Sequence, residues 1–295
     1  MPDQSVTSAV GIVGGGLMGS GIAECMARAQ IATVVYEPSA DALEAARGRV
    51  EGSLARGVRS GKMTSDEAAD ALLEITFTNQ IEDLAPVDFA IEAVTEELEL
   101  KASIFSQLDR VLAADAVIAS NTSSIPIALL ASATSRPELV LGLHFFSPVP
   151  MMDLVEIVVG LDTAEATTER AVALTLAIGK EPIRTKDRSG FIVNTLLVPY
   201  LMAAVRMYED AFASREDIDK GMQLGCGHPM GPLALCDLIG LDVLYAICDS
   251  LYEEFKRPEY APPPLLKRMV AAGRLGRKTG QGFYEYDQSK KKVAA

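Results

Sequence analysis

The sequence predicts an α/β protein in which a doubly wound, mostly parallel sheet is followed by an all-helical C-terminal domain. Three observations predict this class: short apolar strands alternate with helices in the first half, a glycine-rich turn follows the first strand, and the second half is mainly helical. The chain has 295 residues, enough for about two domains. We expect these domains at residues 1–187 and 188–295, because the pattern changes there.

The expected elements follow from short apolar runs, helical stretches and the Gly and Pro residues between them. Strands are expected at residues 9–13, 32–36, 75–78, 87–93, 116–120, 139–143, 154–159 and 182–185. Helices are expected from the glycine turn to residue 30 and at residues 40–60, 97–112 and 163–178. In the second domain, helices are expected at residues 191–212, 215–224, 233–239, 241–256 and 264–272.

The composition excludes several classes of protein. The chain has 27 basic and 40 acidic residues, so its net charge is −13, which argues against nucleic acid as a partner. No apolar run is long enough to span a bilayer, and residues 1–8 show no export signal. We therefore expect a cytoplasmic protein with no membrane partner.

The counts of cysteine and histidine narrow the chemistry further. The four cysteines form no CxxC pair, so we expect free, buried thiols and no metal site; they are Cys25, Cys226, Cys236 and Cys248. A histidine base has two candidates, His144 and His228. His228 lies in a Gly- and Pro-rich turn, and we expect it to be structural.

A G-x-G-x-x-G motif follows the first expected strand, with Gly14, Gly16 and Gly19 in register around Leu17 and Met18. The three glycines allow a tight turn, close approach of the backbone to a pyrophosphate, and close packing of helix on strand. The N-terminus of the helix then offers N–H groups to the phosphates. A glycine turn can be merely structural, but this strand–helix context predicts a Rossmann-type dinucleotide-binding domain.

The choice between NAD and NADP depends on Glu37, at the end of the second expected strand. A carboxylate there can accept hydrogen bonds from both ribose hydroxyls and would repel a 2′-phosphate. The sequence therefore predicts NAD as the cofactor.

Two further polar groups are expected at the carboxyl ends of strands, where open α/β sheets bind ligands. Ser123 follows the strand at residues 116–120, and His144 follows the strand at residues 139–143. Glu156 lies in an apolar strand, where a carboxylate is costly without a partner. An antiparallel return of the chain would bring Glu156 to His144 and orient the imidazole.

Five segments resemble the L-3-hydroxyacyl-CoA dehydrogenase family, particularly its bacterial 3-hydroxybutyryl-CoA dehydrogenases. They are GIVGGGLMGSG at residues 11–21, SNTSS at 120–124, GLHFFSPVP at 142–150 together with Glu156, GFIVN at 190–194, and KTGQGFY at 278–284. Together they cover nearly the whole chain in order.

This resemblance implies that His144 is the general base and that Glu156 orients it. It also implies that Ser123 and Asn194 bind the reacting oxygen and the thioester side of the substrate, and that Asn121 belongs to the same pocket on its cofactor side. From the residues alone, other interpretations stay open. Ser123 could cap the helix entered at Pro126, His144 could be a core histidine, and Asn194 could be a solvated helix residue.

The resemblance further implies that Glu96, Lys101 and Lys278 hold the nicotinamide half of NAD. An acyl-CoA substrate brings anionic phosphates, which need a local basic cluster on a chain of negative charge. Arg49, Ser53 and Arg56 follow i, i+4, i+7 spacing and share one helix face. A solvated face without a ligand is the alternative there.

The expected activity is thus NAD-dependent oxidation of a (3S)-3-hydroxyacyl-CoA, with 3-hydroxybutyryl-CoA as the expected substrate. The alternatives are a related dehydrogenase of a free hydroxy acid such as L-gulonate, and a non-catalytic NAD-binding protein of the lambda-crystallin type. The resemblance and the apolar helices of the second domain predict a homodimer. Thr195 departs from the family, which commonly has Arg directly after GFIVN.

Overall fold

The computed structural model describes residues 7–287, so most of the segment inspected above for an export signal lies outside the described residues. The chain divides into two compact units, Met1–Arg188 and Ser189–Ala295. Each unit has its own apolar core.

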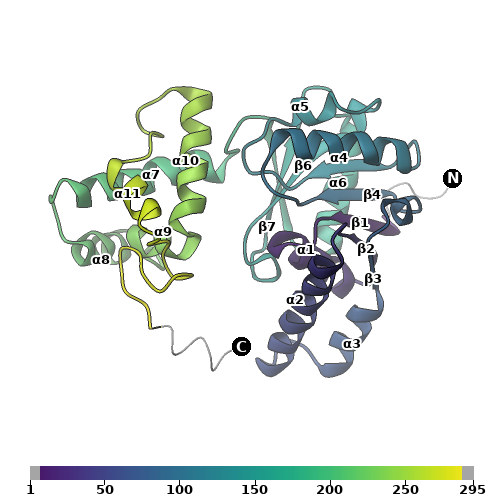
Figure 1. Cartoon of the computed structure of the whole chain (residues 1–295), viewed down its shortest axis with the longest axis horizontal. Helices are drawn as coiled ribbons and strands as arrows, with labels where there is room; N and C mark the ends of the chain where they lie inside the picture. The colour runs from purple at the N-terminus through teal and green to yellow at the C-terminus, as the bar shows by residue number, and fades with distance from the viewer. Residues whose placement is uncertain (1–6, 288–295) are drawn as a thin grey trace. The chain divides into compact units, whose positions relative to one another are not determined.

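The first unit is built on one eight-stranded sheet with the strand order β3-β2-β1-β4-β5-β6-β7-β8 (Figure 1). The strands are β1 (Ala9–Val13), β2 (Ala32–Tyr36), β3 (Ile75–Thr78), β4 (Phe89–Glu92), β5 (Val117–Ser120), β6 (Val140–Phe145), β7 (Leu154–Val159) and β8 (Glu181–Lys186). All neighbouring strands are parallel except β6 and β7, which are antiparallel. The carboxyl ends of β1, β4, β5 and β6 therefore lie along one edge.

Helices lie against both faces of this sheet, as a doubly wound fold requires (Figure 1). They are α1 (Leu17–Arg28), α2 (Ala40–Arg59), α3 (Ser65–Leu73), α4 (Leu98–Val111), α5 (Ile127–Ala131) and α6 (Glu165–Ala177), with 3-10 turns η1 (Ile81–Leu84), η2 (Pro137–Leu139) and η3 (Val149–Met151). All four residues of β4 and of β5 are buried because helices cover both faces. The doubly wound sheet expected from the sequence is confirmed.

Two local predictions for the first unit were incomplete. Helix α3 was not expected, although Thr64 and Glu67 form a capping box at its start. The strand expected at residues 139–143 continues as β6 through Phe145, so His144 lies inside the strand and not after it. The extension arises because β6 pairs with β7 as far as Phe145.

The second unit is helical, as expected. Its helices are α7 (Val193–Glu209), α8 (Arg215–Cys226), α9 (Pro232–Ile239), α10 (Leu241–Phe255) and α11 (Pro264–Ala271). The expectation that all four thiols are buried was wrong for Cys226, which is exposed at the end of α8; the other three are buried, and all four are free. Within residues 7–287, no helix combines the length and apolarity needed to cross a membrane.

Candidate active site

Polar groups of the first unit, among them the predicted glycine loop and His144, gather at one edge of the sheet. The glycine loop follows β1, Glu92 ends β4, Ser120 ends β5, and His144 is the second-last residue of β6. These four strands are consecutive neighbours in the sheet. The edge is therefore the carboxyl-end crevice where α/β sheets of this kind bind ligands.

The glycine loop has the shape that a dinucleotide needs. Gly14 has φ = +101°, and a Cβ added there would lie 2.9 Å from the Ala93 carbonyl oxygen. A Cβ on Gly19 would lie 1.9 Å from the Gly14 carbonyl oxygen, so α1 packs as closely as only glycine permits. A Cβ on Gly16 would meet no atom within 4 Å, which leaves space above the loop for a pyrophosphate.

Glu37 lies next to this loop, directly after β2. Its Oε2 accepts a hydrogen bond from the Gly15 amide at 3.0 Å. Leu17 is 70% exposed and Met18 is half-buried at the start of α1, where no side chain caps the first turn. The loop, the uncapped helix start and the Glu37 carboxylate together fit NAD.

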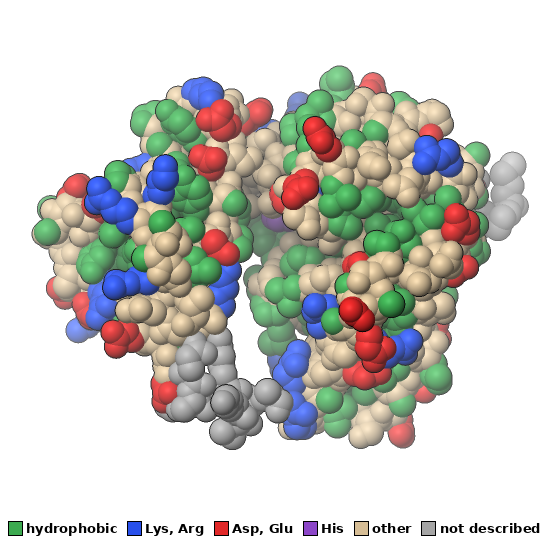
Figure 2. Space-filling model, viewed as in Figure 1, with side chains coloured by type: hydrophobic (Ala, Val, Ile, Leu, Met, Phe, Trp, Pro, Cys, Tyr) green, Lys and Arg blue, Asp and Glu red, His purple; other side chains and the backbone are tan. Residues whose placement is uncertain are grey.

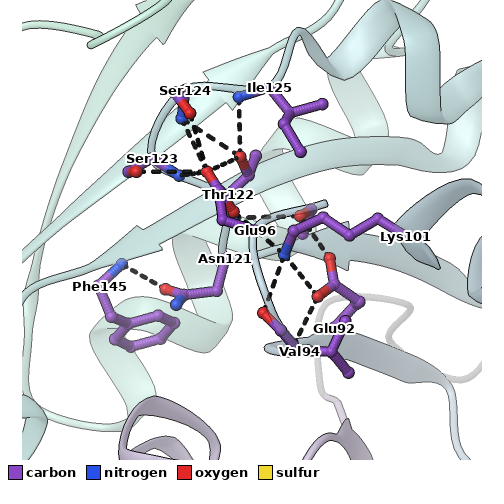
Figure 3. A network of polar contacts seen from close by, with 11 residues as sticks. Glu92, Val94, Glu96, Lys101, Asn121, Thr122, Ser123, Ser124, Ile125 and Phe145 are labelled. Atoms are coloured by element: carbon purple, nitrogen blue, oxygen red, sulfur yellow. Dashed lines mark hydrogen bonds and ion pairs between the residues drawn. The ribbon is translucent and has the colours of Figure 1, made fainter. Parts of the chain in front are cut away.

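A buried ion pair lies beyond the end of β4 (Figure 3). Lys101 reaches from α4, and its Nζ lies 2.6 Å from Glu92 Oε1 and 3.3 Å from Glu96 Oε2. Ser120 Oγ donates to Glu92 Oε2 at 2.7 Å, and the Val94 amide donates to Oε1 at 2.7 Å. Sequence reasoning identified Glu96 and Lys101 but missed Glu92. The signal was present, because a carboxylate at the end of a buried strand requires partners.

Glu96 organises the loop that follows β5. Its Oε1 accepts from the Thr122 hydroxyl at 2.6 Å, from the Ser123 amide at 2.9 Å and from the Ser124 hydroxyl at 3.0 Å. Partial burial raises the pKa of Glu96, but Lys101 and these donors outweigh it and hold the pKa below its usual value. An ionised Glu96 thus fixes the Ser-rich loop.

Ser123 does not cap α5, which contradicts the alternative left open above. The amides of Ile127 and Ala128 donate instead to the two oxygens of Asp187, each at 2.9 Å. The Ser123 hydroxyl makes a long hydrogen bond of 3.3 Å to Glu96 Oε1. Asn121 Oδ1 accepts from the Phe145 amide at 2.9 Å, which links the β5 loop to the residue after His144 (Figure 3).

His144 and Glu156 form the pair that the sequence predicted. They face each other in the antiparallel register of β6 and β7, with 2.7 Å between His144 Nδ1 and Glu156 Oε2. The side chain of Glu156 is fully buried and that of His144 is 8% exposed. The His144 ring also lies against Phe146, with 4.5 Å between ring centroids. A carboxylate at this distance from Nδ1 fixes the orientation of the His144 ring.

The predicted basic face of α2 lines a pocket. Arg49, Ser53 and Arg56 line a cavity of about 480 Å³ together with residues of α1 and the segment Ser147–Pro150. Lys and Arg side chains gather over the region of the surface where Figure 1 places α2 (Figure 2). The pocket also has an acidic group, Glu24, which sequence reasoning did not single out.

The remaining predicted residues belong to the second unit. Asn194 is buried in the first turn of α7, so it is not a solvated residue. Lys278 Nζ donates to Asp242 Oδ2 at 2.6 Å. His228 Nδ1 lies 3.1 Å from the Tyr200 hydroxyl. The buried Thr195 Oγ1 has no hydrogen-bond partner among the residues that the structure describes.

The fold and the site define a class: an NAD-binding α/β unit with a carboxylate-paired histidine at its ligand-binding edge is typical of a nicotinamide-dependent dehydrogenase. Comparison with known families gives the particular family. Residues 9–188 match the NAD-binding domain of 3-hydroxyacyl-CoA dehydrogenase, and residues 190–286 match its C-terminal domain. The chain belongs to the 3-hydroxyacyl-CoA dehydrogenase family, and NAD is its cofactor.

Individual relatives agree with this assignment. The chain is 53% identical over 279 residues to a 3-hydroxybutyryl-CoA dehydrogenase of Mycobacterium tuberculosis. The aligned region covers 94% of this chain and 98% of that protein. The crystal structure of M. tuberculosis FadB2 matches with a TM-score of 0.94 and 52% identity, covering 96% and 100% of the two chains. That of (S)-3-hydroxybutyryl-CoA dehydrogenase PaaH1 from Ralstonia eutropha matches with a TM-score of 0.91 and 44% identity, with the same coverage.

Proposed function

We propose that the protein catalyses NAD-dependent oxidation of (3S)-3-hydroxybutyryl-CoA, or of a close homologue, to the 3-ketoacyl-CoA. The observation that carries this proposal is the 2.7 Å contact between His144 and Glu156 at the same sheet edge as the dinucleotide loop. The crevice thus contains both a candidate base, His144, and a loop that binds the hydride acceptor, NAD.

His144 removes the proton of the 3-hydroxyl through Nε2 in this mechanism. Glu156 holds Nδ1–H, which fixes the tautomer and stabilises the imidazolium that forms. Bound NAD⁺ supplies the acceptor for the hydride that leaves C3. As the O–H and C3–H bonds break, C3 and its oxygen form the ketone, and the proton stays on His144 until solvent removes it.

The hydroxyl and amide groups act on the substrate and cofactor rather than on the proton. Ser123 and Asn194 donate hydrogen bonds to the reacting oxygen and the thioester carbonyl. The long Ser123–Glu96 hydrogen bond is one that the hydroxyl can exchange for a ligand at little cost. Asn121, Glu96 and Lys278 hold the nicotinamide half of NAD, and the buried Lys101 contributes by holding Glu96 in place.

The pocket along α2 binds the acyl carrier. Arg49 and Arg56 provide positive charge for phosphates, and Ser53 lies between them on the same face. This placement favours a CoA ester over a free hydroxy acid, which has no phosphates for these residues to bind.

The direct test is an NADH-coupled assay of the purified protein with acetoacetyl-CoA, longer 3-ketoacyl-CoA esters and free keto acids. Turnover of the CoA esters and little or none of the free acids is expected. Turnover of a free acid such as the L-gulonate product alone, or NAD binding without any turnover, would refute the proposal.

We also propose a homodimer formed through the helical unit. Large apolar side chains of this unit are strongly exposed, among them Phe212 and Leu224, each 77%. Burying such side chains against a second copy would remove apolar area from water, and a C2 dimer is the commonest closed assembly. Light scattering at micromolar concentration should give twice the mass of the chain, and the mass of one chain would contradict this assembly.

A further inference from the structure

Arg49 takes part in two sites of the first unit at once. It lies on α2, and its Nη1 donates to the Gly15 carbonyl oxygen at 2.9 Å across 34 residues of sequence. Gly15 is the central residue between Gly14 and Gly16 of the dinucleotide loop. Arg49 also lines the pocket that contains Ser53 and Arg56.

Side chains of opposite charge hold the backbone of Gly15, one at its N–H and one at its C=O. Its amide donates to Glu37 Oε2 at 3.0 Å, and its carbonyl oxygen accepts from Ser20 Oγ and from Arg49, each at 2.9 Å. A guanidinium has five N–H donors, and the hydrogen bond to Gly15 uses one of them. Arg49 thus stays bound to the loop while it presents charge to a second ligand.

Helix α1 lines the pocket and begins directly after the dinucleotide loop. Leu17, Ser20 and Gly21 of this helix line the pocket. A ligand in the pocket therefore lies close to the loop that receives the pyrophosphate of NAD. Each ligand brings several negative charges, and the net charge of the chain is −13.

Few charged side chains line the pocket, and Arg49 differs from the others in its contact with the dinucleotide loop. Along the described part of the chain, the basic residues that line the pocket are Arg49 and Arg56, and the acidic one is Glu24. Arg56 is seven residues further along α2, and no hydrogen bond from it to the dinucleotide loop is found. Arg49 is the cation that contacts the loop itself.

We propose that Arg49 couples the two nucleotide sites, because its guanidinium offsets the repulsion between the pyrophosphate of NAD and the phosphates of an acyl-CoA. This role rests on the proposed function, which places the acyl carrier in the α2 pocket. Without a cation at this position, each polyanionic ligand weakens the binding of the other. In the wild-type protein the two ligands bind with little mutual penalty.

The test measures binding and not turnover. The dissociation constant of NADH is measured by its own fluorescence with and without saturating coenzyme A, and that of coenzyme A is measured by calorimetry with and without NADH. The variants are Arg49→Gln, the charge-retaining Arg49→Lys, and Arg56→Gln as the matched control from the same pocket.

In Arg49→Gln, each ligand should weaken the other by about tenfold, by the same factor in both directions. That penalty should shrink in 0.5 M salt, because screening reduces charge repulsion. Arg49→Lys should keep most of the wild-type behaviour. Arg56→Gln should weaken coenzyme A alone, by about tenfold, and leave the coupling unchanged.

The outcomes separate the two proposals. If coenzyme A does not bind to the wild-type protein, or binds to Arg56→Gln as tightly as to wild type, the pocket assignment in the proposed function is wrong. If Arg56→Gln weakens coenzyme A but Arg49→Gln shows wild-type coupling, the role of Arg49 alone is refuted. Arg49→Lys behaving like Arg49→Gln would also refute it, because the charge would then not be the cause.

Discussion

Buried carboxylates have different partners in the two units. In the first unit, Glu156 contacts the His144 ring, and Glu92 contacts the Lys101 ammonium and the Ser120 hydroxyl. In the second unit, Asp219 and Asp237 accept mainly from backbone amides: Leu233 and Ala234 at the start of α9, and Phe283 and Tyr284 near the C-terminus. Tyrosine hydroxyls complete both second-unit clusters.

The difference teaches how to interpret a buried acid. A carboxylate that binds backbone N–H groups fixes the path of the chain and satisfies groups that would be costly to bury alone. A carboxylate that binds a histidine or a lysine fixes the position of a proton or a charge, which chemistry can use. The first kind should control stability, and the second should control activity.

The largest effect is expected from the histidine of the first unit. His144→Gln should lower kcat by roughly 10²–10⁴-fold with NAD binding nearly intact, because it removes the proposed general base. Glu156→Gln should also slow turnover, since a neutral partner stabilises imidazolium less. Steady-state kinetics with NADH titration measures both, and His228→Gln, in the second unit, is the control. Near-normal turnover of His144→Gln would remove it from the mechanism.

A smaller effect, on stability and not on activity, is expected at Asp237. Asp237→Asn replaces one of the two accepting oxygens with an NH₂ group, which then faces the backbone N–H of Phe283 or Tyr284. The lost hydrogen bond should lower the free energy of unfolding by about 2–3 kcal/mol. Thermal unfolding by circular dichroism should show the loss, while kcat of the folded variant at low temperature stays within about twofold of wild type. A tenfold loss of kcat in folded protein would mean that Asp237 acts on activity and not only on stability.

The cofactor preference should depend on Glu37. The wild-type protein should prefer NADH over NADPH by at least about tenfold in kcat/KM, or ~1.4 kcal/mol, because the carboxylate repels a 2′-phosphate. Glu37→Ala should weaken NADH use and narrow the gap, whereas Glu44→Ala, at an exposed site of α2, should not. Equal use of both cofactors by wild type would show that Glu37 does not face the ribose.

The smallest effect is expected at Glu24, a carboxylate of the first unit with one buried oxygen that lacks a hydrogen-bond partner among the described residues. Burial raises its pKa, opposed by a hydrogen bond from Ser53 and by Arg28 and Arg56. An acid whose folded pKa is raised loses stability as pH rises from its unfolded value through its folded value. Glu24→Gln removes this loss, so its Tm relative to wild type should increase by about 2–4 °C between pH 4 and pH 8.

The exposed Glu44→Gln variant should show no such trend in a parallel series of melting curves. A Glu24→Gln variant whose Tm falls relative to wild type as pH rises would mean that the ionised carboxylate stabilises the fold.

Much of the first unit could be predicted because its signals are local. The glycine spacing around Gly14, the apolar runs of β1 and β2, and the alternation of strand and helix each depend on a few neighbouring residues. The predicted pairing of His144 with Glu156 needed one more step, the antiparallel return between β6 and β7, which the intervening prolines made apparent. Helix α3 was missed although its capping box is local, so that omission was avoidable.

The strand–helix order, the dinucleotide loop and the residue types available for chemistry follow from the amino-acid order alone, because they depend on backbone preferences and short-range periodicity. Apart from the predicted pair of His144 and Glu156, the contacts among these groups became known from the tertiary structure. Asp187 and not Ser123 caps α5 from about 60 residues away, Lys101 donates to Glu92, and Arg49 donates to the Gly15 carbonyl oxygen. Such contacts depend on the order and twist of the strands, which bring distant residues to one edge of the sheet and which no local pattern specifies.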